Sequence, residues 1–330
     1  MKCPVQSGLR FWLGRSRFLV VLLALLLKLA AAANPSPREL LAAGRVDDAL
    51  QVLERQVSHS ADDAESYNLL CRAYFMLEEW DRGIPSCERA RDLDPKNSLY
   101  QLWLGRIYGE KADRAGFVSA AGLAKKVRIA FESAVELDPR NWEARTDLAE
   151  FYVEAPGIIG GGKDKARAQA DALMPLNPAL AHWIAARIAS KNHDIASAEH
   201  EYRAAIAANQ SLGRAWVDLA GLLLRNNRPD DMERVLHDLE PVQVEQREAL
   251  RDAATVLLRA GRNFPLAARL LRRYLTSPVE AGPAFKAHDL LGQLLEKQGD
   301  RQAAAEQYRA ALALARNYTR AQEDLKRVER

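Results

Sequence analysis

Cysteine and histidine are scarce in this sequence, and their scarcity argues against a structural metal site. Only three cysteines and six histidines occur among the 330 residues. Structural metal sites need about four such ligands at close spacing, and no histidine or further cysteine is placed to complete such a set. The His-Glu-x-x-His pattern of metalloproteases is also absent. We therefore expect neither a metal nor another cofactor.

β-branched residues are sparse as well, whereas alanine, leucine, arginine and glutamate are abundant. This composition is typical of soluble all-α proteins, and no stretch has the alternating pattern of a strand. No serine or cysteine is grouped with a base and an orienting acid at a recognisable spacing. The sequence therefore predicts an all-α protein that is not an enzyme.

Acidic residues are missing from the first 33 positions, and this explains the formal net charge of +3. Five bases lie there: Lys2, Arg10, Arg15, Arg17 and Lys28. The rest of the chain holds 42 bases and 44 acids, so it has no broad basic surface for nucleic acid. We expect no nucleic-acid partner.

A long hydrophobic run is also lacking. The apolar segment 18–27 follows three arginines and precedes Ala31-Ala32-Ala33, which is typical of an export signal with a small-residue cleavage site. Residues 18–33 are only 16 long and include Lys28, short of the roughly 20 needed to span a bilayer. We expect a signal peptide over residues 1–33 and a bacterial protein that is exported, periplasmic or extracellular. The alternative is an uncleaved segment that anchors the protein to a membrane.

The remaining sequence carries a repeated amphipathic pattern, which is clearest in residues 284–316. Apolar residues recur there at helical spacing, namely Phe285, Leu290, Leu291, Leu294 and Leu295. Gly299-Asp300 interrupts the pattern, and a second amphipathic stretch follows. One such helical hairpin cannot cover its own apolar faces, so we expect neighbouring copies to stack on it.

This spacing resembles the tetratricopeptide repeat, a helix-turn-helix unit of about 34 residues. The matching residues are Gly292, Gly299, Ala304, Tyr308 and Ala311, whereas Arg316 stands where proline is usual. The resemblance implies an all-α, right-handed superhelical solenoid of about seven to eight hairpins. It implies a non-catalytic scaffold or adaptor that binds a protein or peptide segment in a concave groove. It leaves the oligomeric state open.

The resemblance covers residues 34–316, with insertions near 110–123 and 154–165, and we expect residues 317–330 to form a C-terminal capping helix. The second insertion contains Gly157–Lys163, which satisfies the G-x-x-x-x-G-K pattern of phosphate-binding loops. A predicted helix precedes it where a strand is required, and Asp164 replaces the hydroxyl residue that would ligate magnesium. We therefore expect a flexible insertion, with a protein or anion contact as the alternative role.

The resemblance also places first-helix residues on the concave face, where we expect a partner to bind. These residues are Asn68, Arg72, Phe75, Arg106, Glu150, Trp183, Arg187 and Arg214. Arginine and aromatic side chains are enriched among residues that dominate binding energy. We expect Arg72→Ala together with Arg106→Ala to weaken partner capture with little loss of thermal stability. The lysine–asparagine clamp of the family's chaperone-tail binders is not matched.

Two other functions stay open at this point. One is a solenoid that binds a small molecule or a glycan, with the Gly157–Lys163 loop as a lid. The other is a membrane-tethered assembly factor of an envelope complex, which requires that residues 1–33 are retained.

The family pattern further brings Cys71 and Cys87 onto facing helices of one hairpin. A disulfide between them is sterically reasonable there, and an exported protein would allow it. The alternative is a pair of small buried thiols that fill the helix interface.

Overall fold

The computed structural model describes residues 35–276 and 283–330. The expected signal peptide, residues 1–33, lies outside this described part of the chain. From Pro37 to Arg330 the chain forms one compact unit. None of the described helices combines the length and the hydrophobicity that crossing a membrane requires.

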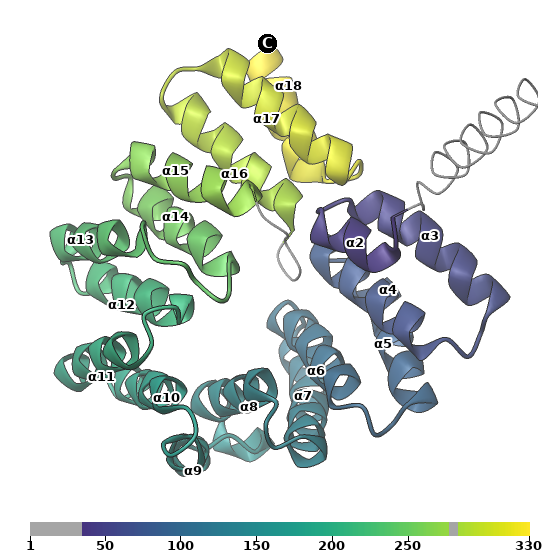
Figure 1. Cartoon of the computed structure of the whole chain (residues 1–330), viewed down its shortest axis with the longest axis vertical. Coiled ribbons are helices and arrows are strands. Elements are labelled where there is room, and N and C mark those ends of the chain that lie inside the picture. The colour runs from purple at the N-terminus through teal and green to yellow at the C-terminus, as the bar shows by residue number, and fades with distance from the viewer. Residues whose placement is uncertain (1–34, 277–282) are drawn as a thin grey trace, which may run out of the picture. The chain divides into compact units, whose positions relative to one another are not determined.

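The described residues form seventeen α-helices and no strand, and successive helices pair into hairpins (Figure 1). The first four pairs are α2 (Pro37–Ala42) with α3 (Val46–His59), α4 (Ala64–Leu77) with α5 (Trp80–Leu93), α6 (Ser98–Asp113) with α7 (Phe117–Leu137), and α8 (Trp142–Glu154) with α9 (Lys163–Leu173). The next four are α10 (Pro178–Lys191) with α11 (Ile195–Ala208), α12 (Gly213–Arg225) with α13 (Pro229–Leu239), α14 (Glu248–Ala260) with α15 (Phe264–Leu275), and α16 (Ala284–Lys297) with α17 (Arg301–Leu314). The last helix, α18 (Thr319–Glu329), packs on α16 and α17. The predicted all-α helical repeat solenoid is confirmed, with eight hairpins in the described part.

Short polar residues begin many of these helices. Their side-chain oxygens accept a hydrogen bond from a backbone N–H in the first turn, which would otherwise lack a partner. The N-caps of this kind are Asp63, Asn97, Asn141, Asn177, Asp194, Asn263 and Asp300. At the other ends, Gly261 and Gly299 adopt φ angles of +67° and +86° just after α14 and α16. These turns let each chain reversal occur within a few residues.

A recurring hydrogen bond joins neighbouring hairpins. In each case the phenolic hydroxyl of a tyrosine on a first helix donates to a glutamate on the second helix of the preceding hairpin. The pairs are Tyr74 with Glu54, Tyr108 with Glu88, and Tyr152 with Glu132. Burial and the hydrogen bond to Glu54 raise the pKa of Tyr74 to about 12. The recurrence at one relative position indicates that successive hairpins stack in a similar register.

Gly105 allows Phe131 of α7 to approach the backbone of α6. A Cβ atom at Gly105 would lie 2.4 Å from the Phe131 ring, whereas one at Gly109, a turn later, would have no neighbour within 4 Å. We expect Gly105→Ala to lower the free energy of unfolding by about 1–3 kcal/mol, because the packed ring must shift. We expect Gly109→Ala to raise it by about 0.5–1 kcal/mol through better helix propensity. Urea unfolding of both variants measures this, and equal effects would contradict the close approach.

The two expected insertions take different forms. The first falls at the turn between α6 and α7, where the helices have 16 and 21 residues against 14 each in α4 and α5. The second contains a short 3-10 helix, η1 (Gly157–Ile159), and the turn that leads into α9. Helix α8 precedes this turn, so the Gly157–Lys163 segment lacks the strand that leads into a phosphate-binding loop.

The last hairpin of the described chain contacts the first two. Phe285 is 1% exposed and belongs to one buried cluster with residues of α2, α3 and α4, among them Leu41. Lys286 pairs with Glu78, and the backbone N–H of Arg316 donates to Asp47 Oδ2 at 2.8 Å. The apolar surface at these two ends of the array is therefore covered within the chain.

Candidate functional site

A pocket of about 380 Å³, called the inner pocket below, gathers most of the expected concave-face residues. Its walls come from the first helices of six consecutive hairpins, α4, α6, α8, α10, α12 and α14, and from Gln246 just before α14. The lining residues are Phe75, Trp103, Arg106, Glu143, Asp147, Glu150, Trp183, Arg214, Val217, Asp218, Gln246, Glu248, Ala249 and Asp252. Five of the eight residues chosen from the sequence are among them.

One wall of the inner pocket is built around Trp103. The guanidinium carbons of Arg72 and Arg106 each lie 4.9 Å from the centroid of its ring. Phe75 meets the same ring edge-to-face, with centroids 5.4 Å apart. Cation–π and aromatic contacts of this kind hold these three side chains against Trp103, so this wall is preformed.

A second aromatic wall is built around Trp183, which is only 2% exposed. Arg214 and Arg187 approach its ring at 5.1 and 5.9 Å from the centroid. The indole Nε1–H of Trp183 donates to Asp218 Oδ2 at 2.8 Å. Trp183 therefore orients a carboxylate of the neighbouring hairpin and presents only a small part of its surface to the pocket.

The role expected for Arg106 needs correction, because its guanidinium is already paired within the chain. Arg106 Nε donates to Asp147 at 2.7 Å and Nη2 donates to Glu143 at 2.8 Å. The side chains of Arg106 and Asp147 are 18% and 16% exposed. Burial alone would lower the pKa of Arg106, but the two carboxylates raise it above its ordinary value. Arg106 thus holds α6 to α8, and two of its five N–H donors are committed to carboxylates of the chain itself.

Arg187 has a similar structural role between α8, α10 and α12. Its guanidinium lies 2.7 Å from Glu150, 3.0 Å from Glu154 and 3.9 Å from Asp218. Burial raises the pKa of Glu150 and of Asp218, and it outweighs the lowering effect of Arg187 on both. The carboxylates in this part of the pocket are therefore incompletely compensated by nearby positive charge.

Asn68 does not lie on an accessible surface, which corrects its placement among partner-binding residues. It is 3% exposed, and its side-chain Nδ2 is buried without a hydrogen-bond partner in the described structure. Helix α4 is buried on several faces and not only on the one that packs against its hairpin partner. The face that carries Asn68 is therefore covered as well. Arg72 stacks on Trp103 beside the pocket but does not line it.

Several carboxylates of the inner pocket were missed in the sequence. Asp147 and Asp252 each stand four residues after another lining acid, Glu143 and Glu248 respectively. Residues four apart share one face of a helix, so this spacing is a signal that could have found them. Trp103 was missed because it lies one turn before Arg106, outside the positions expected from the family pattern.

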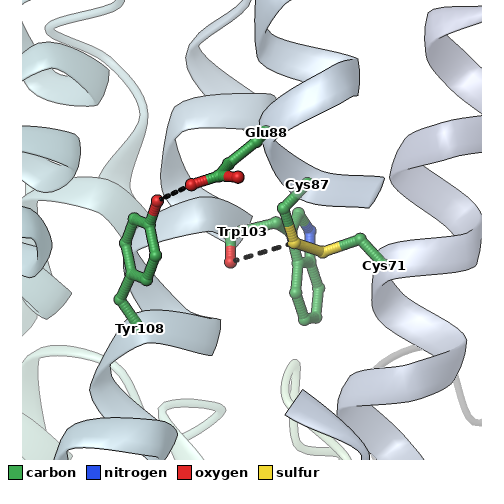
Figure 2. Close-up of a disulfide and its surroundings, with 5 residues drawn as sticks. All are labelled: Cys71, Cys87, Glu88, Trp103 and Tyr108. Carbon is green, nitrogen blue, oxygen red and sulfur yellow. Dashed lines mark hydrogen bonds between the residues drawn. A yellow bond between two sulfur atoms is a disulfide. The ribbon is translucent and has the colours of Figure 1, made fainter. Parts of the chain in front are cut away.

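Cys71 and Cys87 form a disulfide between α4 and α5, with their Cα atoms 5.1 Å apart (Figure 2). Both residues are completely buried. The Cys87 sulfur also lies 4.0 Å from the carbonyl oxygen of Trp103 at the start of the aromatic wall. The covalent bond therefore fixes α4 against α5 within the hairpin that carries Phe75.

Other surfaces of the described chain have fewer polar and charged groups that could bind a ligand. An apolar groove of about 500 Å³ lies between α6, α7 and residues 155–159, and Ile158 at its edge is 90% exposed. Lys165 Nζ donates to the Gly160 carbonyl at 2.9 Å, so a base of the glycine-rich segment is engaged internally. Within the described residues no group of histidine, cysteine or acidic side chains could hold a metal ion.

Comparison with known families follows the same hairpins. A tetratricopeptide repeat model matches residues 40–107, and a second one matches residues 185–231 and 251–319. Together these matches cover more than half of the 330 residues. The chain belongs to the tetratricopeptide repeat family. Members of this family generally mediate protein–protein interactions and generally act as non-enzymatic scaffolds.

Solved structures with a similar fold share little sequence with this tetratricopeptide repeat protein. One is a tetratricopeptide repeat protein of Thermus thermophilus, with 19% identity, 57% of this chain and 95% of that chain covered, and a TM-score of 0.47. Another, from Parabacteroides merdae, has 18% identity, 85% and 100% coverage, and a TM-score of 0.37. A human IFIT1 dimer with m7Gppp-AAAA has 14% identity, 82% and 68% coverage, and a TM-score of 0.43. None of these likenesses bears on function, and no curated protein sequence matches the chain.

Proposed function

We propose that this tetratricopeptide repeat protein is a non-catalytic scaffold that binds a segment of a partner protein in the inner pocket. The observation that supports this proposal most directly is that the first helices of six consecutive hairpins all line the inner pocket. Its walls are held by ion pairs and by the arginine–tryptophan contacts, so little side-chain entropy is lost when a partner binds. Aromatic and arginine side chains in such a concavity are typical of residues that dominate binding energy.

The test of this function is the capture of random displayed peptides by the immobilised full chain. Val217 lines the inner pocket on α12, and we expect Val217→Arg to lower peptide capture about tenfold by filling and charging the pocket. Val118→Arg is the matched control, because Val118 is 85% exposed on α7 and lies outside the pocket. Melting curves of both variants establish that they remain folded. Unchanged capture by a folded Val217→Arg variant would rule out the inner pocket as the binding site.

The proposal that the protein is exported gains support from the Cys71–Cys87 disulfide, since structural disulfides persist in oxidising compartments. It gains further support from the signal-like pattern of residues 1–33. The intact mass of protein from the native host distinguishes the two forms. A chain that begins near Asn34 supports export with cleavage, whereas a full-length chain in the membrane fraction supports the anchored alternative.

A lid over the pocket has no support from the described structure. The Gly157–Lys163 segment does not line the inner pocket, and its residues Ile158 and Ile159 border the separate apolar groove beside α6 and α7. The small-molecule alternative therefore lacks the closing element that motivated it.

A further inference from the structure

We propose that the inner pocket selects a positively charged side chain, arginine or lysine, of the bound segment. This inference rests on the proposed function, because it specifies the chemistry of the partner that the scaffold takes. It also reverses the first expectation for this surface, in which the arginines of the protein bind the partner.

Acidic side chains outnumber basic ones around the inner pocket. Six carboxylates and two guanidiniums line it. Arg106 already pairs with Glu143 and Asp147, and Arg214 stacks on Trp183, which leaves four carboxylates beside one guanidinium that forms no ion pair with a described residue. Charge complementarity at an interface favours a partner of opposite sign, so this lining favours a cation over an anion.

Four carboxylates remain after the Arg106 pairs, and they come from α8, α12 and α14. Glu150 and Asp218 share Arg187, and Asp252 pairs with Arg251 at 2.8 Å. Glu248, at the start of α14, forms no ion pair or hydrogen bond with any described residue. Arg251 acts on Glu248 only electrostatically, so a cationic side chain in the pocket would meet this carboxylate without breaking an ion pair or a hydrogen bond.

An unpartnered hydrogen-bond acceptor lies beside these carboxylates. Gln246 lines the inner pocket two residues before Glu248, and its side-chain oxygen Oε1 has no partner within the described structure. This oxygen is shielded from solvent, so a donor on the bound segment reaches it only when the Gln246 side chain turns toward the pocket. A buried acceptor without a donor is unfavourable, and guanidinium and ammonium groups carry several donors and no acceptor.

The pKa values of two pocket carboxylates show that nearby positive charge does not fully offset their burial. Burial raises the pKa of Glu150 and Asp218 even though Arg187 and Arg214 act to lower both. A further cation beside them would favour the ionised carboxylates and would itself be stabilised. Phe75 and Val217, which line the inner pocket and are only partly buried, supply apolar contact for the carbon stem of a lysine or arginine side chain.

The experiment uses four pools of short acetylated peptides with random flanks and a central residue fixed as arginine, lysine, glutamine or glutamate. We expect the immobilised full chain to retain the arginine and lysine pools about fivefold more than the glutamine pool, and the glutamate pool least. Glu248→Gln should remove most of this preference. The matched control is Glu306→Gln on α17, an exposed carboxylate that makes the same change of net charge away from the pocket.

The outcomes distinguish failure of the cation preference from failure of the scaffold function. A charge preference that is lost in Glu248→Gln and kept in Glu306→Gln supports the inference. Equal retention of all four pools, abolished by Val217→Arg, would overturn the choice of a cation and leave the scaffold function standing. A preference for the glutamate pool, or one that both glutamate variants reduce equally, would also overturn it. Failure to retain any pool would overturn the proposed function itself.

Discussion

Arg106→Ala is expected to lower the free energy of unfolding by about 3–5 kcal/mol. Arg106 and Asp147 form a largely buried ion pair between α6 and α8, with side chains 18% and 16% exposed. Removal of the guanidinium leaves the Asp147 carboxylate charged and poorly solvated, whereas Glu143 is 54% exposed and can be hydrated. Urea unfolding monitored by circular dichroism measures the loss.

Two companion variants distinguish this explanation from a general effect of losing an arginine. Arg214 also lines the inner pocket, but it stacks on Trp183 and forms no ion pair or hydrogen bond with a described carboxylate, so Arg214→Ala is expected to cost only about 0.5–1 kcal/mol. The double variant Arg106→Met with Asp147→Leu removes both buried charges, and it should recover most of the loss. A small effect of Arg106→Ala, similar to that of Arg214→Ala, would contradict the buried pair.

This result would also replace the expectation drawn from the sequence for Arg72→Ala with Arg106→Ala. That double change was expected to spare thermal stability because both arginines were placed on an open binding surface. In the structure Arg106 forms two salt bridges, and both arginines stack on Trp103. Loss of partner capture in such a variant would therefore include a contribution from destabilised helices.

Reduction of the Cys71–Cys87 disulfide is expected to lower the free energy of unfolding by about 3 kcal/mol, the loop-closure contribution for a short loop. The two cysteines are 16 residues apart, and both are completely buried. Thermal melting of the wild-type chain with and without a reductant measures this. We expect a clearly lower melting temperature in the reductant once both thiols are free.

The control is the double variant Cys71→Ala with Cys87→Ala, whose melting temperature should not respond to the reductant. Intact mass before and after reduction reports whether the bond was present, through a gain of two hydrogens. A wild-type chain with the oxidised mass that melts identically in both conditions would refute the stabilising role. Because the disulfide fixes α4 against α5, peptide capture through Phe75 should weaken in the same variant.

The fold was predictable from the sequence because its signals are local. Gly299-Asp300 divides residues 284–316 into two helices, and Gly299 does adopt the left-handed φ angle that ends α16. The same spacing recurs along the chain and yields hairpins that each contact the next. Helix periodicity and turn chemistry operate over a few residues, so a single sequence contains them.

The inner pocket was predictable only in part. Phe75 and Trp183 were found through their position on first helices, which a repeat pattern specifies. The partners of Arg106 and Trp183 were not found, because Asp147 and Asp218 lie 41 and 35 residues away in the sequence. Such distances depend on the lengths of the intervening helices, including the extended α7.

The sequence by itself therefore determined that the chain is helical, where its main turns fall, and that its helices pair as tetratricopeptide repeats. The tertiary structure alone decided that Arg106 serves as an internal ion-pair residue, that Asn68 is buried, and that carboxylates of α8, α12 and α14 face one pocket. The physical reason is the distance along the sequence over which each interaction acts. Helix formation and capping depend on neighbours within one or two turns, whereas charge pairing and burial depend on which hairpins are stacked together.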